Sequence, residues 1–80
     1  MNDVKHIPSQ NERIIEYMKT YGGITQMEAL KKISVMRLAS RISDLRRRGY
    51  RINDRFQTVT NKYGEKCNVK VYWLEGDSDA

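Results

Sequence analysis

Hydrophobic residues recur every three or four positions in the first part of the chain, first over residues 10–21 and again over residues 26–33. This spacing predicts two amphipathic helices, each with one apolar face. A serine or threonine precedes each segment and a glutamate follows three residues later, which is the pattern of a capping box. Gly22 and Gly23 suit the end of the first helix. The predicted capping pairs are Ser9 with Glu12 and Thr25 with Glu28, and the predicted inner faces hold Ile14, Met18 and Tyr21 in the first helix and Ala29, Leu30 and Ile33 in the second.

A third amphipathic segment follows, and Ser34 is expected to act as its N-cap. This helix should then continue to Gly49. Only two or three residues separate it from the second helix, which is the spacing of a helix-turn-helix, with the two helices roughly perpendicular. At about 100° per residue, the predicted core sector consists of Leu38, Ile42 and Leu45, with Val35 and Ala39 beside it.

Beyond Gly49 the period of the pattern changes from 3.6 to 2, which predicts strands over residues 50–60 and 67–74. The polar residues between them include Gly64, which can adopt a positive φ, so the strands should form a β-hairpin. Since such a hairpin is not stable alone, it needs the helices as its base. The expected fold class is α+β, a three-helix bundle followed by a two-stranded antiparallel hairpin. The expected anchors of the hairpin are Phe56, Val71 and Trp73.

Positive charge is concentrated in the second half of the chain. The 80 residues carry a net charge of +5, with a pI of about 9.6. Residues 37–70 alone hold ten lysines and arginines against three acids, a net of +7. This asymmetry predicts a polyanionic partner, most commonly nucleic acid, although a solvated basic surface is the simpler alternative. No apolar run approaches the length of a membrane span and no signal peptide is visible, so we expect a cytosolic protein with no membrane partner.

The outer side of the third helix is the candidate base-reading surface. Arg37 and Arg41 lie four residues apart near its N-terminus, where like charges and the helix dipole both disfavour them. A facing polyanion would turn this penalty into attraction, whereas a solvated face with intrahelical pairs is the alternative. Asp44 could hold Arg41 for contact with guanine or accept a hydrogen bond from cytosine. One polar stripe consists of Met36, Ser40, Ser43 and Arg47, and its neighbour consists of Arg37, Arg41, Asp44 and Arg48.

The arginines at the far end of this helix have a different predicted role. Arg47, Arg48 and Arg51 are expected to bind phosphates, which position a protein on DNA without specifying sequence. Arg46 lies near the core boundary and is expected to bond within the protein. The hairpin tip is expected to contact a flanking phosphate or the minor groove, with an ordinary solvated turn as the alternative. The candidates at the tip are Lys62, Tyr63 and Lys66.

Metal and enzyme chemistry are not expected. Cys67 and His6 are the only cysteine and histidine in the chain, which excludes a zinc finger and an intramolecular disulfide. There is no Gly-rich phosphate loop, and no pair of carboxylates lies in an evident pocket. We therefore expect no catalytic residue, no cofactor and no small-molecule ligand. Residues 1–8 and 76–80 are expected to be disordered tails around a single domain at residues 9–75.

Several short phrases then point to a known family. They are Ile24-Thr25, Glu28-Ala29-Leu30, Arg37-Leu38-Ala39-x-Arg41-Ile42-x-x-Leu45-Arg46, Gly49-Tyr50 and Asn61-x-Tyr63-Gly64. With these residues the chain resembles, over about residues 9–74, the small winged helix-turn-helix proteins common in phages and prophages. The resemblance implies three helices followed by a two-stranded wing, a DNA-binding module and a bacterial host cell. It implies no particular operator sequence.

The expected function is binding to double-stranded DNA, with the third helix in the major groove and the hairpin on the backbone. The expected role is transcriptional regulation or assistance to recombination in a phage or prophage. The alternative is a winged-helix interaction module whose arginine face binds a host or phage protein. A homodimer could form through a surface of exposed apolar residues. The candidates for that surface are Tyr17, Tyr21, Tyr72 and Leu74.

Overall fold

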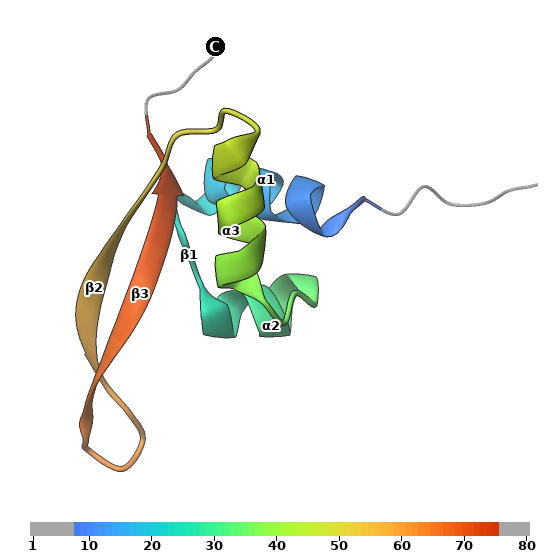
Figure 1. Cartoon of the computed structure of the whole chain (residues 1–80). Helices are drawn as coiled ribbons and strands as arrows, with labels where there is room; N and C mark the ends of the chain where they lie inside the picture. Colours follow the sequence, from blue (N-terminus) through green and yellow to red (C-terminus); the bar gives the residue numbers. More distant parts are fainter. Residues whose placement is uncertain (1–7, 76–80) are drawn as a thin grey trace, which may run out of the picture.

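The computed structural model describes residues 8–75, in which three helices pack against one end of a long β-hairpin (Figure 1). Of the predicted tails at residues 1–8 and 76–80, all but Pro8 lie outside the described residues, including His6. No helix among the described residues is both long and apolar enough to cross a membrane. The elements are α1 (Gln10–Tyr21), β1 (Ile24–Thr25), α2 (Gln26–Ile33), α3 (Leu38–Arg47), β2 (Ile52–Thr60) and β3 (Lys66–Leu74).

Both predicted capping boxes are present. The Glu12 amide donates to the Ser9 hydroxyl at 3.1 Å, and the Ser9 amide donates to the Glu12 carboxylate at 2.9 Å. The same reciprocal pair forms between Thr25 and Glu28 at the start of α2. Gly22 ends α1 with a φ of 86°, a left-handed conformation that a residue without a Cβ adopts readily. The first two helices therefore begin where the local sequence predicts.

The start of the third helix differs from the prediction. Ser34 is not its N-cap, because it ends α2 in a left-handed conformation with a φ of 60°. The chain then runs through a turn, and α3 begins only at Leu38. The side chain of Gln26 holds this turn, since its Nε2 donates to the Val35 carbonyl at 3.2 Å and its Oε1 accepts from the Leu38 amide at 2.9 Å. These two hydrogen bonds link the start of α2 to the start of α3.

The sheet has three antiparallel strands in the order β1-β3-β2, so the prediction of a two-stranded hairpin is wrong in this respect. β1 pairs with β3, placing Ile24 opposite Tyr72 and Thr25 opposite Val71. Ile24, an isolated apolar residue in the sequence, is fully buried in this strand. A strand of two residues shows no periodicity, which is why the local pattern does not reveal it.

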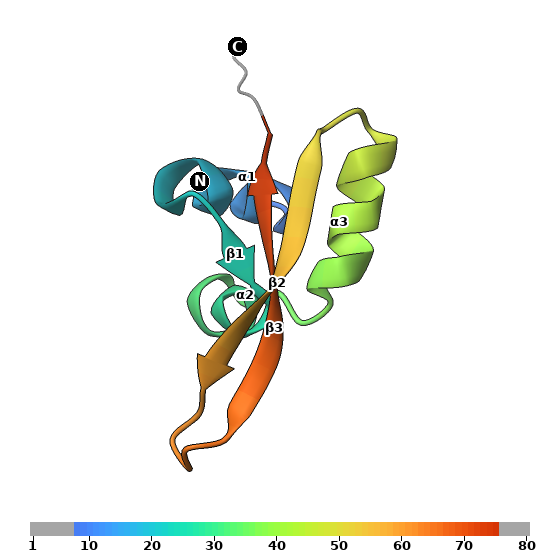
Figure 2. The same ribbon diagram turned by 90° about the vertical axis from the view of Figure 1, so that its left-hand side faces the viewer.

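The β2–β3 hairpin, residues 52–74, is called the wing below. Its strands pair along their whole lengths, from Ile52 opposite Leu74 at the base to Thr60 opposite Lys66 near the tip. The outer half of the wing extends past α2 and α3, as two perpendicular views show (Figures 1 and 2). Only the base of the wing is therefore covered by the helices.

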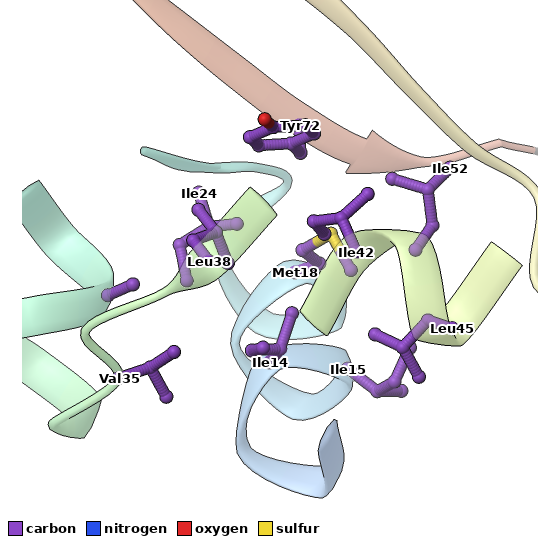
Figure 3. Packing of buried hydrophobic residues seen from close by; sticks show 11 residues of the cluster. Ile14, Ile15, Met18, Ile24, Val35, Leu38, Ile42, Leu45, Ile52 and Tyr72 are labelled. Carbon is purple, nitrogen blue, oxygen red and sulfur yellow. The ribbon is translucent and has the colours of Figure 1, made fainter. Parts of the chain in front are cut away.

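The hydrophobic core draws on all three helices, the turn before α3 and all three strands (Figure 3). On β3 its anchor is Tyr72, which is only 8% exposed. Tyr72 is therefore removed from the predicted dimer surface, and Leu74 also packs partly against the core. The buried residues are Ile14, Ile15, Met18, Ile24, Ala29, Val35, Leu38, Ile42, Leu45, Ile52 and Tyr72.

Several predicted core positions lie at the surface. Phe56 shares a face of β2 with the buried Ile52 but is 67% exposed, and its ring lies 5.1 Å from Lys70 Nζ of the neighbouring strand. Leu30 faces an open groove between α2 and β3, and Tyr21 and Ala39 are also exposed. The other predicted anchors, Val71 and Trp73, are half-buried on the face of β3 opposite to Tyr72.

Candidate nucleic-acid interface

The exposed face of α3 lies directly opposite its buried face. Leu38, Ile42 and Leu45 are buried, which fixes the rotation of the helix about its axis. At 100° per residue, the opposite side then consists of Ser40, Ser43 and Arg47, all of which are exposed. No side-chain hydrogen bond involves Ser40 or Ser43 among residues 8–75, so their hydroxyl groups are free for a partner.

The N-terminal end of α3 carries a cation in place of a cap. Arg37 occupies the N-cap position without a side-chain capping bond, and the first turn contains no acidic residue. The sequence predicts that Met36 and Arg37 lie on the third helix, but both precede it, because α3 begins at Leu38. Both residues are exposed. The positive end of the helix dipole and the Arg37 guanidinium therefore add to one another here.

Arg41 and Asp44 lie on the flank of α3 and not on its fully exposed face. Both side chains are half-buried. The predicted contact between them is absent, since the partners of Asp44 among the described residues are Asn11, Arg47 and Arg48. The Arg41 guanidinium has no hydrogen bond or ion pair within residues 8–75.

Asp44 instead links α3 to α1 through a hydrogen bond and forms ion pairs with Arg47 and Arg48. Asn11 of α1 donates to Asp44 Oδ2 at 2.8 Å, while Arg47 lies 3.3 Å from Oδ1 and Arg48 lies 3.2 Å from Oδ2. The hydrogen bond from Asn11, followed by the charges of Arg48 and Arg47, lowers the pKa of Asp44 despite the opposing effect of partial desolvation. The ionised carboxylate holds both guanidinium groups near the C-terminal end of α3.

Arg46 bonds within the protein, as the sequence predicts. Its Nε and Nη2 donate to the Ile52 carbonyl at 3.0 and 2.6 Å, and Nη2 also lies 2.7 Å from an oxygen of Asp54. The Arg46 hydrogen bond is the main cause of a lowered pKa of Asp54. These contacts tie the end of α3 to the first residues of β2, and so fix the wing relative to the helix.

The tip of the wing is organised by one asparagine. The Asn61 Oδ1 accepts from the Tyr63 amide at 2.9 Å and from the Glu65 amide at 3.0 Å. Gly64 completes the turn with a φ of 84°. Lys62 and Tyr63 are exposed side by side, with the ammonium group 5.4 Å from the ring centroid. The exposed Lys66 follows at the start of β3, so the structure brings the three predicted tip residues together.

The candidate interface also includes residues that have no predicted contact of their own. The helical wheel predicts that Ser43 shares a polar stripe with Ser40, and the structure leaves both exposed. Two cations lie over aromatic rings along the wing, Arg55 at 5.7 Å from Trp73 and Lys70 at 5.1 Å from Phe56. In each pair the cation and the ring lie on different strands, so the contact can be recognised only when the register of β2 and β3 is known.

Among the described residues, no group of three or more His, Cys, Asp or Glu side chains is placed to hold a metal ion. Cys67 is a free thiol on β3. Its Sγ accepts from the side-chain Nδ2 of Asn61 at 3.5 Å, a contact within the turn of the wing.

The comparisons with known proteins agree with this architecture. The sequence profile described as a winged helix-turn-helix domain matches residues 9–76. No curated protein and no solved structure matches the chain. Domains of this type are typically non-enzymatic and suggest DNA as the partner. On the extent of the match, together with three helices and a three-stranded antiparallel sheet, the chain belongs to the winged helix-turn-helix domain family.

Proposed function

We propose that the protein binds double-stranded DNA with the exposed face of α3 in the major groove and the wing on the neighbouring backbone. Ser40 and Ser43 approach the base edges, since short side chains permit close contact. Arg37 and Arg41 supply guanidinium groups able to bond guanine. The proposed DNA-contacting set is Met36, Arg37, Ser40, Arg41, Ser43, Arg47, Arg48, Lys62, Tyr63 and Lys66.

One observation carries this proposal: the arginines near the start of α3 have no partner inside the described residues. The side chains of Arg37 and Arg41 have no hydrogen bond or ion pair there, whereas the Arg46 side chain bonds to the first residues of β2. A helix selected for stability alone would place an acid at its N-terminus, as α1 and α2 do. A polyanion facing this end of α3 accounts for the difference.

The arrangement of α3 and the wing suits one continuous duplex. The N-terminal end of α3 and the tip of the wing lie toward the same end of the molecule (Figures 1 and 2). A duplex that receives α3 in its major groove can then meet Lys62 and Lys66 along its backbone. Arg47 and Arg48, held together by Asp44, would bind phosphates at the other end of the helix.

Within this proposal, the biological role is transcriptional regulation or an architectural role in recombination, in a phage or prophage. Both roles need the same contact with duplex DNA. A selection of binding sites from random duplexes distinguishes them, because a regulator should select one short motif, whereas an architectural protein should favour deformable steps with few fixed bases. Asp44, initially a candidate reader, is assigned to positioning because its carboxylate is already occupied.

Titration of a labelled duplex at several salt concentrations tests the proposal. Contact with about six phosphates should give a log-log slope of affinity against salt on the order of −5. Lys62→Ala should weaken all sequences alike and reduce the slope by about one. Absence of duplex binding even at low salt would reject the proposal and favour the alternative of a protein-interaction module.

A further inference from the structure

The turn before α3 presents two exposed side chains between two buried ones. Val35 and Leu38 are fully buried, whereas Met36 is 76% exposed and Arg37 beside it is exposed as well. The Gln26 side chain bonds the Val35 carbonyl and the Leu38 amide, one at each end of this turn. Met36 is therefore held on a backbone that is fixed on both sides, and its side chain is not part of the core.

A second exposed apolar side chain lies at the start of α3. Ala39 is exposed, and it borders a largely apolar groove between α2, β3 and α3. At about 100° per residue, Ala39 lies on one side of the row formed by Ser40 and Ser43, and Arg41 lies on the other. The exposed face of α3 therefore has a methyl group on one side of its serines and a guanidinium group on the other.

The bases of DNA differ in the chemical groups that suit these two sides. In the major groove, guanine presents two acceptors that an arginine can bond, whereas thymine presents a 5-methyl group. Thymine is the only base of unmodified DNA with such a methyl group. An apolar side chain gains free energy by covering it, but offers no hydrogen bond to the polar edge of another base. Recognition helices contact base edges with their N-terminal residues, which is where Met36 and Ala39 lie.

We propose that Met36, together with Ala39, reads the 5-methyl group of a thymine in the major groove. This inference rests on the proposed binding of duplex DNA by α3, and adds the class of base that the start of the helix selects. The unbranched methionine side chain is flexible enough to fit against a methyl group of the groove. The short side chains of Ser40 and Ser43 let the helix approach to the roughly 4 Å at which apolar atoms touch.

Replacement of thymine by uracil tests the proposal, because uracil lacks only the methyl group. The probe is a fluorescein-labelled duplex of the motif selected from random sequences, in which each thymine is replaced by uracil in turn. At one position the replacement should weaken binding by about three- to sixfold, as expected for one buried methyl group. A selection without a fixed thymine, or equal binding of thymine and uracil at every position, would overturn the proposal and leave duplex binding by α3 intact. Absence of any duplex binding would reject the proposed function itself.

Substitutions of Met36 assign the effect to this residue. Met36→Ser should bind the thymine and uracil duplexes equally, because serine is too short to cover the methyl group. Met36→Leu should keep the preference for thymine, since it restores an apolar side chain. Tyr21→Ser is the matched control and should also keep it, because Tyr21 is 71% exposed on α1, away from the start of α3. All three variants should unfold near the wild-type midpoint, since both residues are exposed. A Met36→Ser variant with the wild-type preference would overturn the proposal.

Discussion

The two ends of α3 carry the same type of residue in opposite states. At the C-terminal end, Arg46, Arg47 and Arg48 each lie within 3.3 Å of a carboxylate oxygen. At the N-terminal end, Arg37 and Arg41 have no such partner among residues 8–75, and no acid occupies the first turn. Charge that is neutralised inside the protein positions the helix, whereas unpaired charge is available to a ligand. A count of arginines alone would merge these two roles.

The largest effect expected from this comparison is on DNA recognition at the N-terminal end. Arg41→Ala should lower affinity for the selected duplex by about ten- to a hundredfold, because one bidentate contact with a base contributes on the order of 1–3 kcal/mol. The thermal unfolding midpoint should change little. Binding to selected and scrambled duplexes measures the effect, and unchanged sequence preference would exclude Arg41 as a reader.

The next largest effect is expected on the stability of the fold, from a substitution at the C-terminal end of α3. Arg46→Ala should lower the free energy of unfolding by on the order of 1–2 kcal/mol, since the buried Ile52 carbonyl loses its donors. Urea unfolding followed by circular dichroism measures this change. The folded Arg46→Ala variant should keep the sequence preference of the wild type for DNA. A variant as stable as the wild type would mean that the Arg46 contacts do not hold the wing.

A smaller effect is expected for an arginine that is paired but exposed. Arg48→Ala should reduce affinity only a few-fold, equally for selected and scrambled duplexes, and should make the salt slope shallower by about one. Its effect on unfolding should be slight, because exposed ion pairs contribute little. If Arg48→Ala instead changes sequence preference, the distinction between the two ends of α3 is incorrect.

The smallest effect is expected in the pH dependence of stability, through the ionisation of Asp44. Since its pKa is lowered in the folded state, the ionised carboxylate stabilises the fold above its unfolded pKa of about 3.9, and this stabilisation is lost as the pH falls through the folded pKa. Asp44→Asn should therefore be less stable than the wild type near neutral pH, and the difference should shrink in acid. Urea midpoints at pH 7 and pH 3 make the comparison. A difference that is constant with pH would assign the loss to packing.

The parts of the fold that the sequence predicts are those fixed by local contacts. The capping boxes at Ser9 and Thr25 each span only three residues, and both are present as predicted. Arg46 also follows from the helical wheel, because its place beside the core leaves it near the following strand. In each case the deciding interaction lies within a few residues of the signal.

The predictions fail where a contact between residues far apart in the sequence determines the local structure. Ser34 has the composition of an N-cap, but the Gln26 side chain fixes the following turn and delays α3 to Leu38. The alternation in β3 offers two possible faces, and only packing against the helices selects the one with Tyr72. Phe56 lies on the same face of β2 as the buried Ile52 but is 67% exposed. Periodicity specifies which side of a strand a residue occupies, and not whether the rest of the protein covers it there.

The two serines on the exposed face of α3 are positions at which the amino acid can be replaced without loss of the fold. Ser40 and Ser43 contribute neither to the core nor to any hydrogen bond among the described side chains. In the proposed complex with DNA, substitution at these two positions would therefore alter which bases are contacted while the fold is preserved. A small library of variants at Ser40 and Ser43 would then sample new target sequences without disturbing the core.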